Sequence, residues 1–317
     1  MLLIRVGTHQ RYRLILVTMA DAKIDANEID IESVEYIQQL ASTDGRLESP
    51  IDLNMSHMTQ IQLPPLQWLN YEIPPKKLKI ANTGSTVIIS AKWERERAHL
   101  FGGPFLQSFI FSQIHFHWGE NDMSGSEHYV DGGRMPMELH AVHFKSDYAS
   151  QEEALLKPDG IAILVYFFKL QDLENPYINE ILQALNFIRA AHTSIRLVPS
   201  TLTNLIKPFE HDYFTYWGSI KIYRRPCSVL WLVSREPIGI TSGQIMQFRT
   251  LRSVDETPIL SNCRPLQDKQ DRTIFYISPL GSNYATLLPV FRKYPIRVDA
   301  ATDTNLEDVK GKEFIRS

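Results

Sequence analysis

The stretch that decides the fold is SQIHFHWG at residues 112–119, in which His115 and His117 lie on either side of a phenylalanine. Residues 108–118 are rich in β-branched and aromatic side chains and predict a strand. Side chains alternate between the faces of a strand, so His115 and His117 point the same way and Phe116 points to the opposite face. The motif therefore delivers two imidazoles to one side of a predicted sheet.

A third histidine, His140, lies in the next strand-like run, residues 137–144. Neighbouring antiparallel strands are about 4.8 Å apart, close enough to bring His140 beside the first two histidines. Three neutral imidazoles with one open position suit a catalytic Zn²⁺. A His-x-His pair alone is more often structural or exposed. It is the third histidine that favours a zinc site made of His115, His117 and His140.

Two polar residues are placed to support these ligands. A ligating histidine usually donates its other N–H to a carboxylate, an amide or a carbonyl. Gln113 lies on the same strand face as His115, and Glu138 lies on the same face as His140. His143 falls on the face opposite His140 and is predicted to be structural.

Composition excludes several classes of protein. The chain has 317 residues, 44% of them apolar and 22% charged, which is ordinary for a globular protein. A net charge of -3 and scattered basic residues give no case for nucleic-acid binding. The longest apolar runs, such as residues 161–168, are too short to span a membrane. The two cysteines, Cys227 and Cys263, form no disulfide framework and are predicted to be free thiols.

From about residue 45 onward, short apolar runs alternate with Pro, Gly, Asn and Asp residues. This pattern predicts a single mainly β domain at residues 45–281, with a few short helices at its periphery. Residues 1–44 are predicted to be an N-terminal extension that contains a short amphipathic helix near residues 29–41. Residues 282–317 are predicted to be a poorly ordered C-terminal tail. Apolar runs and turn residues predict the following elements: strands within 78–92, 108–118, 137–144, 161–170 and 229–233, and helices at 180–191 and 242–251, the latter capped by Thr241 or Ser242.

The motifs resemble the α-carbonic anhydrase family. Residues 112–119 resemble its signature strand, 125–128 its Gly-Ser-Glu-His segment and 137–143 the strand that carries the third zinc ligand. Residues 48–52, 157–160, 216–219 and 262–265 continue the resemblance, which spans roughly residues 45–280. It implies a twisted, mostly antiparallel sheet of about ten strands, and reversible hydration of CO₂ to bicarbonate by a zinc-bound hydroxide.

The resemblance also implies roles for individual residues. Gln113 would orient His115, Glu138 would orient His140, and the backbone carbonyl of Asn262 would orient His117. An apolar CO₂ pocket would be lined by four further residues, for which ordinary core packing is the competing interpretation. These are Val142, Ile163, Val229 and Trp231.

Three departures from the family pattern stand out, and the first two concern catalysis. Lys221 stands where the family has a threonine that links the zinc hydroxide to the glutamate represented here by Glu127. Lysine has no acceptor, so we expect Lys221 to pair with Glu127 or to lie near the hydroxide. Losing such a contact lowers the rate by about 10²–10³. Ser85 stands at the position of the family's proton-shuttle histidine, and Cys227 has no partner near Ser49 for the extracellular members' disulfide.

Two functions therefore remain open. One is a slow zinc-dependent carbonic anhydrase; the other is a catalytically silent, carbonic anhydrase-related protein that acts as a zinc-stabilised binding module. The chain is expected to be a monomer with CO₂ or bicarbonate as its small-molecule substrate. A cytoplasmic location is favoured by the unpaired thiols. Secretion stays possible because residues 14–22 loosely resemble a signal peptide, although their apolar run is shorter than the usual span of about 7–15 residues.

Overall fold

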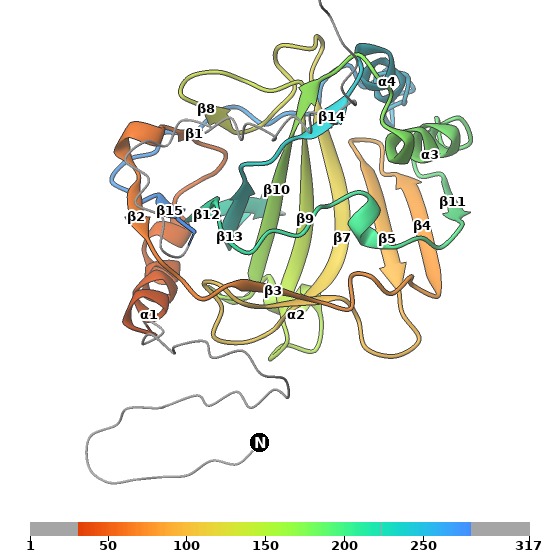
Figure 1. The fold of residues 1–317 in the computed structure, drawn as a ribbon. Helices are drawn as coiled ribbons and strands as arrows, with labels where there is room; N and C mark the ends of the chain where they lie inside the picture. The colour runs from red at the N-terminus through yellow and green to blue at the C-terminus, as the bar shows by residue number, and fades with distance from the viewer. Residues whose placement is uncertain (1–30, 223, 280–317) are drawn as a thin grey trace, which may run out of the picture. The chain divides into compact units, whose positions relative to one another are not determined.

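The computed structural model describes residues 31–222 and 224–279. Its centre is a sheet of 13 strands, ten of which follow the order β11-β4-β5-β7-β9-β10-β13-β12-β15-β2 (Figure 1). Most neighbours run antiparallel; β10 with β13, β10 with β14, and β15 with β2 run parallel. The predicted mainly β fold with a mostly antiparallel sheet of about ten strands is confirmed. The strands are β1 Asp52–Leu53, β2 Thr59–Ile61, β3 Leu66–Leu69, β4 Lys77–Asn82, β5 Val87–Lys92, β6 His99–Gly102, β7 Phe109–Trp118, β8 Tyr129–Val130, β9 Met137–Lys145, β10 Ile161–Leu170, β11 Ser194–Leu197, β12 Tyr213–Ile222, β13 Arg225–Ser234, β14 Ile238–Ile240 and β15 Phe275–Ile277.

Short helices lie around this sheet. The α-helices are α1 Ile31–Gln39, α2 Gln151–Ala154, α3 Pro176–Leu185 and α4 Ser242–Phe248, and the 3₁₀ turns are η1 Leu40–Ser42, η2 Asp44–Arg46, η3 Met55–His57 and η4 Leu202–Asn204. The predicted helix at 180–191 is wrong at both ends. Asn175 caps α3 and Pro176 occupies its first turn, a start signal that apolar spacing does not reveal. For α4 the cap is Thr241, which forms a capping box with Gln244.

The amphipathic helix predicted near residues 29–41 is α1, which buries Val34 and Ile37. Trp217 of β12 donates its indole N–H to the carbonyl oxygen of Ile37 at 2.7 Å. These contacts place the apolar side of α1 in the same core as the sheet. The boundaries drawn at residues 45 and 281 stay predictions, and the predicted tail at 282–317 lies outside the described residues.

A β-bulge in β7 sets the orientation of the site. Phe111 pairs with His143 of β9, but Gln113 pairs with Val142, so Ser112 is an extra residue without a partner. Phe111 and His143 therefore face the core, whereas Gln113 and Val142 face the opposite side. His143 is buried as predicted for a structural histidine, with its Nδ1 3.0 Å from the carbonyl of Ala141.

Candidate metal centre

Three ring nitrogens converge on the face of β7 and β9 that lies opposite the core. The Nδ1 atom of His140 lies 3.2 Å from Nε2 of His117 and 3.2 Å from Nε2 of His115. His115 and His140 are direct cross-strand partners, and His117 follows two residues along β7. A tetrahedral Zn²⁺ with Zn–N bonds of about 2.0–2.1 Å needs ligand nitrogens about 3.3 Å apart. The three predicted ligands thus come together with the spacing that zinc requires.

A second group, His128, Glu138 and His140, also contains metal-ligand atoms. Its oxygen and nitrogen atoms are much closer together: Oε1 of Glu138 lies 2.6 Å from Nδ1 of His128 and 2.5 Å from Nε2 of His140. These are hydrogen-bond distances, too short for two ligands of one zinc ion. Glu138 therefore belongs to the support of His140 rather than to a metal site of its own.

Each imidazole of the trio has a hydrogen-bond partner on the side away from the converging nitrogens. Nδ1 of His115 lies 3.3 Å from Oε1 of Gln113, and Nδ1 of His117 lies 3.3 Å from the carbonyl oxygen of Asn262. His140 uses Glu138, as described above. The structure thus holds all three contacts implied by the family resemblance, and each contact fixes which ring nitrogen is left for a metal.

Burial favours the neutral form of His115 and His117. It lowers the pKa of His115 well below the usual value and lowers the pKa of His117 to about 4, with the neighbouring imidazoles adding to the effect. Zinc binds the neutral imidazole, so His115 and His117 need lose no proton near neutral pH.

Glu127 is completely buried and is bound by an arginine that sequence reasoning left without a role. Arg264 donates its backbone N–H and its Nε–H to Oε1 of Glu127, each at 2.9 Å, and Nη2 binds Oε2. Burial opposes ionisation of Glu127, but His117 and the guanidinium together hold its pKa well below the usual range. Among the residues the structure describes, no hydroxyl is hydrogen bonded to this carboxylate.

Lys221 is not where the sequence predicted it. Its ammonium pairs with Oε1 of Glu48 at 2.5 Å, and its side chain is 58% exposed. β12 and β13 pair as far as Ile222 and Arg225, so that Lys221 faces Pro226 in a regular ladder. Tyr216 and Trp231 are also partners in this ladder, and the Trp231 ring lies 5.2 Å from that of His140. Lys221 lies five positions after Tyr216, an odd step along the strand, so Lys221 points to the other face, away from Glu127 and the trio.

A cavity of about 730 Å³ opens beside His115 and His117. Ser85 lines it, and the carbonyl of Ser85 accepts a hydrogen bond from the Asn262 amide at 3.1 Å. Cys263 lines it too, but its Sγ contacts backbone carbonyls and burial raises the pKa of the thiol to about 11. Cys263 is therefore a protonated thiol at neutral pH, and it is not disulfide-bonded to Cys227.

The four predicted apolar pocket residues form one buried group on three neighbouring strands. Ile163 of β10 pairs with Val142 of β9 on one side and with Trp231 of β13 on the other, and Val229 lies two residues before Trp231. All four are buried, and none lines the open cavity. They adjoin the trio through the contact of Trp231 with His140.

Two further buried groups were missed as site residues. His128 hydrogen bonds to Glu138 through Nδ1 and to the Tyr216 hydroxyl through Nε2 at 2.7 Å, and that hydroxyl lies 3.0 Å from Oγ of Ser49. This series of hydrogen bonds connects His140, through Glu138, with Ser49 near the start of the predicted domain. Of these residues only Tyr216 lies within a long strand-like run, and no local pattern in the sequence pairs it with His128 or Ser49.

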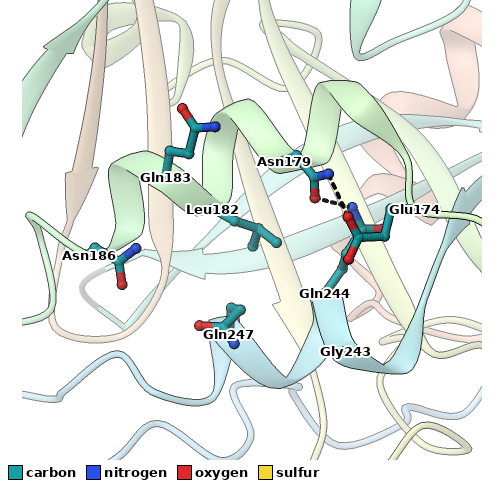
Figure 2. Close-up of a pocket in the computed structure, with 8 residues that line it drawn as sticks. All are labelled: Glu174, Asn179, Leu182, Gln183, Asn186, Gly243, Gln244 and Gln247. Atoms are coloured by element: carbon teal, nitrogen blue, oxygen red, sulfur yellow. Dashed lines mark hydrogen bonds between the residues drawn. The ribbon is translucent and has the colours of Figure 1, made fainter.

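A second cavity, of about 460 Å³, lies between α3 and α4 (Figure 2). Most of its lining is amide side chains, including Asn179, Gln183 and Gln247, with a single carboxylate from Glu174. Gln244 bridges the two helices, because its side chain binds Asn175 and Asn179. This cavity has no histidine or cysteine in its lining and is unrelated to the metal centre.

Comparison with known proteins identifies the family. A family model described as eukaryotic-type carbonic anhydrase matches residues 34–278. The chain belongs to the carbonic anhydrase family. Carbonic anhydrase 1 of Mus musculus is 35% identical over 236 residues, which cover 73% of this chain and 89% of the relative. Carbonic anhydrase 1 of Oryctolagus cuniculus is 34% identical over 236 residues, covering 73% and 98%, and that of Monodelphis domestica is 35% identical over 240 residues, covering 73% and 90%.

The carbonic anhydrase match begins at residue 34, within α1 and inside the segment predicted to be an extension. No helix among the described residues is long and apolar enough to cross a bilayer.

Proposed function

We propose that this chain binds one Zn²⁺ and hydrates CO₂ reversibly, but slowly. The observation that carries the proposal is the convergence of three ring nitrogens, from His115, His117 and His140, at the spacing of zinc ligands. When bound, zinc would supply a Lewis acid that lowers the pKa of a coordinated water to about 7.

The protein's own contribution is to hold the three imidazole rings and to fix their orientation. Gln113, Glu138 and the carbonyl of Asn262 fix the three rings. The buried group of Val142, Ile163, Val229 and Trp231 offers an apolar wall beside His140, which suits a small apolar substrate such as CO₂. Water-filled access would come from the cavity beside His115, and Ser85 at this cavity has no pKa near neutrality with which to transfer a proton.

Slow turnover follows from Glu127. Both of its oxygens accept hydrogen bonds from Arg264, Oε1 also lies 3.2 Å from Nδ1 of His117, and Lys221 lies on the far face of β12. Within the described residues no hydroxyl is hydrogen bonded to Glu127, so the contact that would link it to the nucleophile is missing. Its loss lowers the rate by about 10²–10³ relative to a family member that has it.

The same observation supports the alternative of a silent, zinc-stabilised binding module. In that case the trio serves stability alone, since zinc that binds only the folded chain stabilises it. The two unpaired thiols favour the cytosol under either proposal. A monomer is proposed as well.

Zinc stoichiometry and CO₂ hydration, measured on the same preparation of the full chain, test the proposal. We expect one zinc per chain by plasma mass spectrometry, lost in His117→Ala and kept in His57→Ala, whose imidazole is exposed and belongs to neither group of possible metal ligands. Stopped-flow CO₂ hydration should exceed the buffer rate and disappear in His117→Ala. Zinc without hydration would support the binding module, and a chain that binds no zinc would refute both.

A further inference from the structure

Four positive side chains share one face at the end of the sheet. β11, β4 and β5 are consecutive strands, and the register pairs Arg196 with Lys79 and Lys77 with Lys92. Cross-strand partners lie on the same face, and residues two apart on one strand do so as well. Arg196, Lys79, Lys77 and Lys92 therefore form a continuous cationic face. Lys79 also pairs with Ser90, which pairs with Gln113, so this face continues to the support of the metal centre.

These four cations are free in the described part of the chain. All four side chains are exposed, and none has a carboxylate within ion-pair distance there. Other basic residues, such as Lys145, Lys207 and Arg235, each have an acidic partner. The net charge of the chain is -3, so this uncompensated group is a local feature rather than a general excess of positive charge.

The outer edge of β11 offers backbone hydrogen-bonding groups next to this face. β11 is the last strand of the described sheet on that side (Figure 1). The amide of Asn82 donates to the carbonyl of Thr193, which makes Ser194 and Ala81 a non-hydrogen-bonded pair. The N–H and C=O groups of Ser194, and of Arg196 two residues later, must then point away from β4. Within the described residues these groups have no backbone partner.

We propose that β11 is a docking site for an extended acidic peptide, which adds one strand to the sheet. Its backbone would pair with Ser194 and Arg196, and acidic side chains at alternate positions would lie on the cationic face. One of them would lie directly opposite Arg196, about 5.5 Å away between Cα atoms. Lys79 lies a strand further in, about 10 Å from the added strand and within about one Debye length at 0.1 M salt.

Charge decides against a second copy of this chain as the occupant. Antiparallel pairing of two β11 edges would join two cationic faces side by side, and like charges across strands are destabilising. Charged side chains are a common defence of edge strands against such self-pairing. The same charges select a partner of opposite sign, so the occupant that fits this edge is an acidic strand.

A designed probe separates strand addition from simple charge attraction. The probe is the fluorescent peptide Thr-Glu-Val-Glu-Val-Glu-Thr, compared with Thr-Val-Glu-Glu-Glu-Val-Thr, which has the same composition without the alternation. A third peptide carries the alternating sequence with N-methyl groups on the amides that would face β11. Binding to the full chain is measured by fluorescence anisotropy, for the wild type, Arg196→Glu and the control Lys169→Glu, which reverses an exposed charge on β10.

We expect the alternating peptide to bind and Arg196→Glu to weaken it at least tenfold, with Lys169→Glu within twofold of the wild type. The N-methylated and block peptides should each bind at least tenfold more weakly. Hydrogen exchange at the amides of Ser194 and Arg196 should slow in the complex. Equal binding of all three peptides would show a general polyanion surface and overturn the proposal. So would absence of binding at millimolar peptide, or a dimer in sedimentation that uses this edge.

Discussion

Restoring a threonine at position 221 should not restore fast catalysis. Lys221 faces Pro226 across the ladder, on the side of β12 opposite Trp231 and the histidine trio. Lys221→Thr would place its hydroxyl on that same far side. The ion pair that it removes joins two exposed side chains and stabilises the fold by no more than about 1 kcal/mol. We therefore expect the variant to fold normally and its CO₂ hydration rate to stay within about threefold of the wild type.

Changing the backbone as well should have a much larger effect. Replacing residues 220–224 by Leu-Thr-Thr-Pro-Pro places a proline at position 224, where φ is 66°. Proline fixes φ near about −65°, so the present turn cannot form and the end of the hairpin opens. A threonine freed from the ladder can turn toward Glu127. If this supplies the missing contact, the rate rises by up to about 10²–10³, equivalent to roughly 3–4 kcal/mol of transition-state stabilisation.

Stopped-flow CO₂ hydration of the zinc-loaded proteins measures both effects, with zinc content determined on each sample. A control replaces only residues 223 and 224 by proline, which opens the hairpin without adding a hydroxyl and should leave the rate unchanged. An increase of more than tenfold from Lys221→Thr alone would refute the reasoning, since it would place position 221 next to the reacting groups. A wild type as fast as threonine-containing relatives would refute it too.

Three further predictions concern stability and are measured by urea unfolding. Ile37→Ala should lower the free energy of unfolding by about 2–5 kcal/mol because Ile37 is fully buried, whereas exposed Glu35→Ala should change it by less than about 0.5 kcal/mol; equal effects would mean that α1 is not docked. Thr241→Ala removes the cap of α4 and should cost about 1 kcal/mol, and no loss would argue against the capping box. Burial lowers the pKa of His143 to about 3, below the unfolded value of 6.5, so the unfolded chain takes up the proton first and stability is lost as pH falls from 6.5 toward 3. Between pH 7 and pH 5 this loss is about 2 kcal/mol, and it should be absent in His143→Gln; an unchanged pH dependence would mean that His143 is not the group responsible.

The strands that carry the site were predictable because their residues repeat a simple pattern. β10 was predicted with the bounds it has, since an uninterrupted apolar run of this length fits a strand buried on both faces. The trio followed from the two-residue repeat of β7 and from the pairing of the next strand. Gln113 and Glu138 followed from the same two-residue repeat. A polar side chain on the same strand face as a ligand is close enough to accept the hydrogen bond of its second ring N–H.

What could not be predicted depends on contacts between distant residues. Lys221 was assigned to the threonine position by its place in the family pattern, which does not reveal that the β12–β13 ladder continues past it to Ile222 and Arg225. Arg264 lies 137 residues from Glu127, and no local pattern pairs them. The start of α3 was different: Asn175 and Pro176 were a readable cap, and the apolar spacing that continues to Ile188 outweighed it.

The extra residue in β7 has a consequence for how this strand can change. Odd-numbered positions before Ser112 supply aromatic side chains to the core, and odd-numbered positions after it supply ligands to the metal centre. The odd-numbered residues of β7 thus pack in the apolar core at one end of the strand and face the metal centre at the other. The single inserted residue, Ser112, separates the two parts. Substitutions on either side of the division can accumulate independently. Deletion of Ser112 cannot be absorbed in this way, because it would turn either the phenylalanines or all the β7 imidazoles to the wrong side at once.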